Sequence, residues 1–232
     1  MTDTRRKVLL GVAGVVVAAA LAVGGYLLWQ KNADPYAGMT LWRETQIDDA
    51  TRALLEQRIA TTEASIAVQE AEDGAAEADL YLSLANDAHI LGDLVKTREA
   101  LEKLLNENPI MHAAWNMYGN VLSRMGDLEP AEKAYLEAIE INPSAEYYMD
   151  FVTFLDKYYP ERDEEMLLTL EHAVAVLGQR SEFMVALAEW YRSHSECAKA
   201  IDHYKVAQTL SPENTAIADD LAATRATCVE AE

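Results

Sequence analysis

The sequence predicts an all-α protein in which one membrane-spanning helix precedes an array of repeated helix pairs. Two observations lead to this prediction. Residues Val8–Trp29 contain no charged side chain and no proline. Further along, Gly92 and Gly126 lie 34 residues apart, as do Pro109 and Pro143. Self-similarity at a fixed period of this length is typical of stacked helical repeats.

The composition excludes several classes of function. The 232 residues include 19 Lys and Arg against 39 Asp and Glu, a formal net charge of −20. Binding to DNA or RNA requires cations that neutralise phosphates, so we expect no nucleic-acid partner. Two cysteines are too few for a disulfide-rich miniprotein or a four-cysteine zinc site.

The uncharged stretch predicts a membrane anchor over residues 8–29. Its 22 residues would form a helix about 33 Å long, and a bilayer core is about 30 Å thick. Arg5, Arg6 and Lys7 precede it. A basic flank favours the cytoplasmic side, so residues 1–7 are predicted to be a short cytoplasmic end. We therefore expect a single-pass protein of the cell membrane whose C-terminal domain is periplasmic or otherwise extracytoplasmic.

A cleaved signal peptide is the alternative interpretation of this segment. The apolar run exceeds the 7–15 residues usual for a signal core, which favours an uncleaved anchor. Gly14, Ala18 and Ala22 form a stripe of small residues that could pair two anchors in a homodimer. Small residues are also common in such helices without pairing.

A linker and a lead-in segment come after the anchor. Residues 30–39 contain Pro35 and Gly38, which break helices. Residues 40–73 have a helix-forming composition with a sparse apolar stripe of Leu54, Leu55, Ile59 and Ile66. The stripe suits either one long stalk helix or a degenerate helix pair that packs on the array of repeats.

Residues 112–145 carry the clearest copy of the repeat. Its key positions are Trp115, Tyr118, Gly119, Leu122, Gly126, Ala131, Tyr135, Ala138 and Pro143. This pattern resembles the tetratricopeptide repeat (TPR) family. The resemblance implies a right-handed superhelix of about four helix pairs over residues 78–213, closed by a capping helix over residues 214–230. Gly119 and Ala131 would let the two helices approach closely, and Tyr135 would fill the space beyond them.

The other copies are less regular. Residues 78–111 fit, except that Thr97 replaces a small Ala, and residues 181–214 fit well. Residues 145–180 diverge, because Pro160 interrupts the pair and leaves its register uncertain by one residue. We expect the core of this third pair to comprise Tyr148, Phe151, Val152, Leu155, Leu167, Leu170 and Ala173. The capping helix should bury Ile217, Leu221 and Ala222.

The resemblance also brings the two cysteines together. Cys197 begins the second helix of the fourth pair, and Cys228 lies near the end of the capping helix. Adjacent helices of such a stack run antiparallel, so these residues would lie at the same end of neighbouring helices. A disulfide is permitted if this part of the chain is extracytoplasmic. Two unrelated thiols are the alternative.

The sequence gives little indication of catalysis. No phosphate-binding glycine loop, nucleophile elbow or zinc-protease motif is present. His194, Cys197 and His203 are the one group with the residue types of a metal site, but surface histidines beside a structural cysteine explain them more simply. We expect no enzyme activity, no metal and no cofactor.

The resemblance implies a binding groove on the concave face, lined by the first helix of each pair. The predicted groove residues are Leu82, Asn86, His89, Asn116, Asn120, Arg124, Val185, Glu189 and Arg192, with Met149, Thr153, Asp156 and Lys157 from the irregular third pair. Asn86 and Asn120 occupy equivalent positions, and family members that hold a peptide main chain use Asn there because an amide donates and accepts. Leu82, Val185 and Glu189 stand where chaperone-binding members have basic residues, so a chaperone carboxylate clamp is absent.

Two functions remain open from the sequence. The first is a membrane-anchored scaffold that holds a protein or an extended peptide in the groove. The second is a chaperone-like accessory subunit of an envelope assembly pathway, similar in architecture to cytochrome c biogenesis subunits and translocon-associated factors. The second rests on the arrangement of anchor and repeats alone.

Overall fold

The computed structural model describes residues 47–229 of the chain. The predicted cytoplasmic end (1–7), anchor (8–29) and linker (30–39) lie outside these residues. None of the helices within residues 47–229 has the length and hydropathy needed to cross a membrane.

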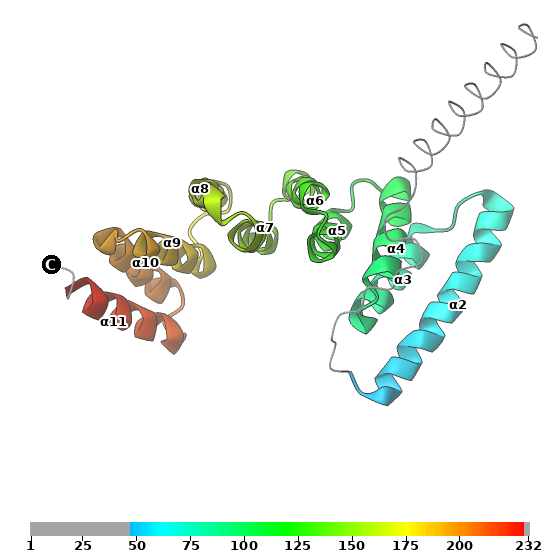
Figure 1. Cartoon of the computed structure of the whole chain (residues 1–232), viewed down its shortest axis with the longest axis horizontal. Helices are drawn as coiled ribbons and strands as arrows, with labels where there is room; N and C mark the ends of the chain where they lie inside the picture. The colour runs from blue at the N-terminus through cyan, green and yellow to red at the C-terminus, as the bar shows by residue number, and fades with distance from the viewer. Residues whose placement is uncertain (1–46, 230–232) are drawn as a thin grey trace, which may run out of the picture. The chain divides into compact units, whose positions relative to one another are not determined.

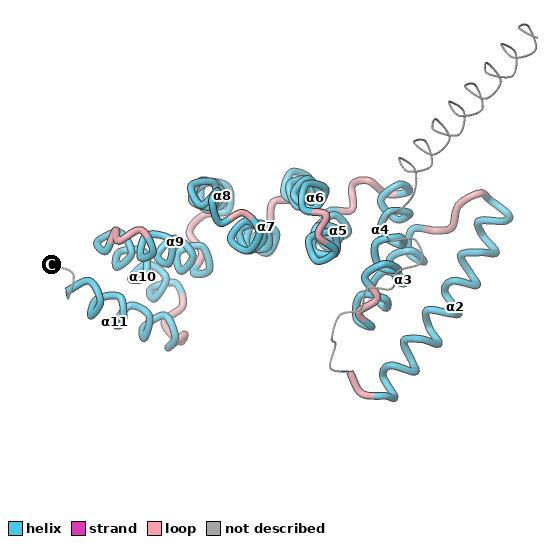
Figure 2. Tube along the Cα trace, in the orientation of Figure 1, coloured by secondary structure: helices cyan, strands magenta, loops and turns pink. Residues whose placement is uncertain are grey.

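The described residues form ten α-helices and one 3-10 turn, joined by short loops (Figures 1 and 2). Four antiparallel pairs, α3 with α4 through α9 with α10, are flanked by α2 before them and α11 after them. The bounds are α2 Asp49–Asp73, α3 Ala78–Leu91, α4 Leu94–Glu107, α5 His112–Met125, α6 Leu128–Ile141, α7 Ala145–Tyr158, η1 Pro160–Arg162, α8 Asp163–Leu177, α9 Ser181–Ser193, α10 Cys197–Leu210 and α11 Thr215–Val229.

The lead-in segment contains one continuous helix, α2, which packs on α3. The Asp48 side chain accepts from the backbone N–H of Thr51 at 2.8 Å and caps its N-terminus. Leu55, Ile59 and Ile66 are buried, whereas Leu54, which we included in the apolar stripe, is 55% exposed. The buried residues recur about every 3.6 positions and form one face. Leu54 lies about 100° away from Leu55 around the axis, which turns it to solvent.

The turn inside each helix pair explains the repeated glycines. Gly92 and Gly126 both have φ of 91°, a left-handed conformation that costs Gly little. In the fourth pair Ser195 takes this position with φ of 60°. In all three turns, the residue after this position donates its backbone N–H to the carbonyl oxygen five residues earlier. The donors are Asp93, Asp127 and Glu196, each at 2.9 Å. Ser195 therefore keeps the repeat geometry without the residue that usually signals it.

The third pair is joined by the turn that contains Pro160. Here Arg162 donates a bidentate pair of hydrogen bonds to Glu132 of α6, at 2.7 and 2.9 Å, and two more to Glu165 of α8. Its guanidinium also lies 4.7 Å from the ring centre of Tyr159. The hydrogen bonds from Arg162 lower the pKa of Glu132. The irregular turn thus fixes α6 to α8.

The contact between α5 and α6 confirms the role predicted for Gly119. A Cβ atom added at Gly119 would lie 3.0 Å from three ring atoms of Tyr135. Tyr135 is only 2% exposed, and its ring centre lies 6.3 Å from that of Phe151 and 5.3 Å from that of Phe154. Only a residue without a side chain leaves room for this ring.

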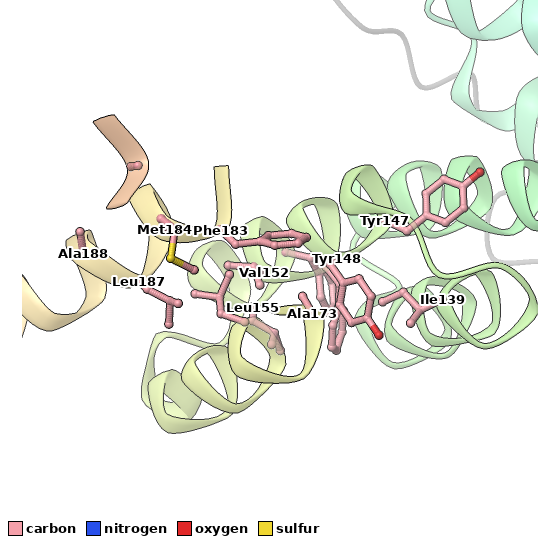
Figure 3. Packing of buried hydrophobic residues seen from close by; sticks show 14 of the residues in the cluster. Ile139, Tyr147, Tyr148, Val152, Leu155, Ala173, Phe183, Met184, Leu187 and Ala188 are labelled. Carbon is pink, nitrogen blue, oxygen red and sulfur yellow. The ribbon is translucent and has the colours of Figure 1, made fainter. Parts of the chain in front are cut away.

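The core continues through the third and fourth pairs (Figure 3). Tyr148, Val152 and Leu155 of α7 are buried together with Phe183 and Leu187 of α9. The core predicted for the third pair is found, with Leu167 only partly buried against it. The irregular turn therefore does not interrupt the core.

The last helix, α11, packs against α10. Ile217, Leu221 and Thr224 are buried, whereas Ala222 is exposed, which corrects our expectation. The buried face has the spacing i, i+4, i+7, and Ala222 falls outside it. Cys197 of α10 and Cys228 of α11 form a disulfide in the structure, with Cα atoms 5.8 Å apart.

Candidate functional site

The candidate site lies on the face made by the first helices of the second, third and fourth pairs, α5, α7 and α9, which we call the first-helix face. One cleft, of about 300 Å³, opens between α5 and α7. We call it the α5–α7 cleft. Its lining comprises Asn120, Ser123, Arg124, Tyr135, Asp150, Thr153, Phe154, Lys157 and Tyr158. Aromatic rings and polar groups therefore line the same cleft, as is common in peptide-binding sites.

A second cleft, of about 470 Å³, lies between α7 and α9 and reaches η1 and α8. We call it the α7–α9 cleft. Among its lining residues are Met149, Thr153, Asp156, Asp163, Met166, Glu189, Trp190, Arg192 and His194. Thr153 lines both clefts. The two clefts therefore adjoin at Thr153 on the exposed surface of α7, and we call them together the track.

The α5–α7 cleft carries the basic part of this track. Arg124 and Lys157 line it, and Lys157 Nζ lies 4.9 Å from the ring centre of Tyr158. The one carboxylate in the lining, Asp150, accepts a hydrogen bond from Asn116 Nδ2 at 2.7 Å. A locally basic cleft stands out in a chain with a net charge of −20.

The α7–α9 cleft carries the acidic part. Asp156, Asp163 and Glu189 line it with Arg192. Partial burial raises the pKa of Glu189, and the charge of Arg192 opposes that rise. Three carboxylates and one guanidinium therefore line this cleft.

His194 lies at one end of the α7–α9 cleft and contacts both α8 and α9. Its Nε2 lies 2.7 Å from Asp163 Oδ2, and its Nδ1 lies 2.8 Å from the carbonyl oxygen of Trp190. Both neighbouring oxygens are acceptors, so both ring nitrogens are best satisfied when they carry hydrogen. The Trp190 carbonyl and then Asp163 accordingly raise the pKa of His194. The ring also stacks on Trp190 with centres 3.8 Å apart.

The predicted groove residues divide into three groups. Those that line the track are Asn120, Arg124, Glu189 and Arg192, together with Met149, Thr153, Asp156 and Lys157. Leu82, Asn86, His89 and Val185 line neither cleft. Asn116 is only 8% exposed and does not line the cleft itself, but it donates a hydrogen bond to Asp150, which does. The equivalent residues Asn86 and Asn120 thus have different surroundings, because neither cleft extends to α3.

Sequence reasoning missed the aromatic and second-helix contributions to the track. Tyr135, Phe154 and Tyr158 form the apolar wall of the α5–α7 cleft, and Trp190 and His194 end the α7–α9 cleft. Burial raises the pKa of Tyr135 to about 12, so its hydroxyl stays protonated at neutral pH. A helical wheel of α7 would have placed Phe154 and Tyr158 on one face, but their meeting with Tyr135 depends on how α6 packs.

Two of the three residues with the types of a metal site have other partners in the structure. Cys197 is bonded to Cys228, and His203 stacks on Tyr191 with ring centres 5.2 Å apart. Among residues 47–229 no group of three or more His, Cys, Asp or Glu side chains is arranged to hold a metal ion.

Comparison with known families identifies the repeat. A family model described as the PRP39 N-terminal HAT repeat matches residues 66–208, which is more than half of the chain. The chain belongs to this HAT-repeat family. The match begins inside α2 and ends inside α10, so both clefts lie within the HAT repeats. Repeat arrays of this kind are typically protein-interaction scaffolds rather than enzymes.

Solved structures of other proteins resemble this array of helix pairs. A fragment of MamA from Desulfovibrio magneticus RS-1 is 18% identical, with a TM-score of 0.53 over 65% of this chain and 84% of its own. YrrB, described as a TPR protein with an unusual peptide-binding site, is 16% identical, with a TM-score of 0.52 over 70% and 83%. TTC0263, a TPR protein of Thermus thermophilus, is 20% identical, with a TM-score of 0.50 over 75% and 97%.

At these identities the similarity shows the fold alone. It confirms the prediction of a TPR-like array of helix pairs. No curated protein matches the sequence.

Proposed function

We propose that this protein is a membrane-anchored scaffold that holds an extended segment of a partner protein along the first-helix face. The observation that supports the proposal best is that Thr153 lines both clefts, so that they adjoin on α7. A peptide in extended conformation advances about 3.3 Å per residue and needs a long, narrow track rather than a closed pocket.

The chemistry of the track suits a peptide main chain with charged side chains. Asn120 is exposed, and its amide can both donate to and accept from a backbone. Arg124 and Lys157 would attract acidic side chains at one end, and Asp156 and Glu189 would attract basic ones at the other. This polarity would fix the direction in which the segment lies.

The anchor and its topology form the second part of the proposal. The uncharged stretch over residues 8–29 and the basic residues before it support a helix that enters the membrane from the cytoplasm. The repeats would then face the extracytoplasmic side, where a disulfide such as Cys197–Cys228 is stable.

The binding proposal can be tested by affinity purification of the full-length chain from detergent-solubilised membranes, followed by mass spectrometry. The test variant carries Asn120→Ala and Thr153→Ala. The matched control is Asn86→Ala, which changes the equivalent amide outside both clefts. We expect one defined set of partners with the wild type and the control, and its loss with the test variant.

Equal recovery of partners by all three proteins would refute the role of the track. Recovery of many unrelated exported chains would instead favour a chaperone-like accessory subunit of an envelope assembly pathway. Topology is tested separately with alkaline phosphatase or a green fluorescent protein joined after Glu232 in bacterial cells. Phosphatase activity without fluorescence is the expected result, and fluorescence without phosphatase activity would overturn the proposed orientation.

A further inference from the structure

A third cleft lies on the opposite side of α7 from the first-helix face, between the second helices α6 and α8. We call it the α6–α8 cleft. It has a volume of about 630 Å³ and is lined by Leu136, Ile139, Glu140, Pro143, Tyr148, Phe151, Leu168, Thr169, His172 and Val176. Tyr148 and Phe151 of α7 contribute to it from between the two helices, and Figure 3 shows Tyr148 with Ile139 in this part of the molecule.

Several apolar side chains that line the α6–α8 cleft are exposed to solvent. Leu136 is 45% exposed, Leu168 59% and Val176 47%, which makes them three of the large exposed hydrophobic residues within the described part of the chain. The polar atoms of Tyr148 and His172 contact each other, with Tyr148 Oη 2.9 Å from His172 Nδ1. Contiguous apolar surface of this kind marks interaction sites more often than single exposed residues do.

The helices beside the cleft are strongly acidic. Together α6 and α8 contain eight Asp and Glu residues and a single Lys, Lys133, which pairs with Glu129 at 2.8 Å. Glu137, Glu140 and Glu171 are exposed next to the apolar lining. A partner must therefore offer apolar side chains to the cleft and positive charge to its edges.

We propose that the α6–α8 cleft binds an amphipathic helix of a partner protein, with apolar residues on one face and Lys or Arg on its flanks. Leu168, His172 and Val176 of α8 lie four residues apart and form a row about 12 Å long. Such a row makes a ridge that can pack into the groove between the i, i+4 and i+7 side chains of another helix. A second copy of this chain fits less well, because it would bring the same acidic charge to an acidic rim.

Hydrogen bonds near one end of the α6–α8 cleft join its two walls. Arg162 links Glu132 of α6 to Glu165 of α8 through four hydrogen bonds. Glu132 lies one helical turn before Leu136, and Glu165 lies one turn before Leu168. The two walls are therefore held in place near one end of the cleft, so little ordering is needed on binding.

The experiment uses the full-length chain in detergent and a fluorescent synthetic helical peptide, with leucines at i, i+4 and i+7 and lysines on both flanks. A second peptide has glutamates in place of the lysines. Because a lysine-rich peptide adheres to many acidic surfaces, the decisive readout is dependence on the apolar lining. The test variant is Leu136→Ser with Leu168→Ser. The control is Leu210→Ser, because Leu210 lies outside the cleft and its 43% exposure is close to that of Leu136.

We expect the lysine-flanked peptide to bind the wild type and the Leu210→Ser control equally, and the double variant about tenfold more weakly or worse. The glutamate-flanked peptide should bind none of them. Equal binding by the double variant, binding of both peptides alike, or no binding to the wild type would each overturn the proposal. Self-association that sedimentation velocity detects and the double variant abolishes would overturn it in favour of a second copy. Asn120→Ala with Thr153→Ala should leave peptide binding unchanged, which separates this site from the track.

Discussion

Replacing Gly119 with Ala measures how tightly α5 and α6 are packed. Carbon atoms in optimal contact lie about 3.5–4.0 Å apart, and the new methyl carbon would lie 3.0 Å from Cγ, Cδ1 and Cδ2 of Tyr135. The ring has little room to retreat, because Phe151 and Phe154 pack on it. Overpacking of this kind costs about 1–3 kcal/mol, whereas Ala gains about 0.8–1 kcal/mol over Gly in a helix.

The expected net effect of Gly119→Ala is a loss of up to about 2 kcal/mol in the free energy of unfolding. Gly119→Leu brings more atoms against the same ring and should cost about 1–3 kcal/mol or more. Urea denaturation followed by circular dichroism gives these values, provided that the slope with denaturant stays constant.

A double-mutant cycle with Tyr135→Ala isolates the contact. Without the ring, Gly119→Ala should stabilise the protein by about 0.8–1 kcal/mol, because only the gain in helix propensity remains. The sign of its effect should therefore reverse between the two backgrounds. An effect of the same size and sign in both would show that the close approach of the two helices does not limit this position.

Three further predictions concern the ends of the helices. Replacing Cys197 and Cys228 together with Ser should lower the free energy of unfolding by about 3–4 kcal/mol, because the disulfide closes a loop with a sequence separation of 31; equal denaturation midpoints for this variant and the wild type under non-reducing conditions would contradict this. Replacing Ser195 with Gly should raise stability by up to about 1 kcal/mol, because the left-handed conformation costs Ser more than Gly; a lower thermal midpoint would count against it. NMR titration should give His194 a pKa above its ordinary value of 6.5. A raised pKa means that its contribution to stability is complete below about pH 6.5 and is lost as the pH rises through the folded value, so His194→Ala should remove this loss; an unshifted titration would refute the two-acceptor arrangement.

The helical repeat is encoded in local patterns of the sequence. Gly92 and Gly126 mark turns that need a left-handed residue, and Pro109 and Pro143 mark helix ends. These are constraints within a few residues of chain, so they can be recognised without knowing the fold. Ser195 shows the limit of this reasoning, because the same left-handed turn forms at a residue whose type does not signal it.

The candidate track could be predicted only in part. The resemblance to the tetratricopeptide repeat placed Asn86 and Asn120 at equivalent positions of the groove, but in the structure only Asn120 lines a cleft. The two asparagines are equivalent in sequence and differ only in what packs beside their helices. A cleft is a gap between elements, and its position depends on how neighbouring pairs meet.

The order of residues along the chain is enough to establish a row of paired helices, because helix periodicity, turn residues and repeat length are local properties. The positions of the clefts, in contrast, depend on how helices that are distant in the chain pack together. Tyr135 of α6 meets Phe154 of α7 in one cleft, and Leu136 of the same helix meets Leu168 of α8 in another. Side chains adjacent in sequence point to different faces of α6, and only the packing of its neighbours determines what each face adjoins.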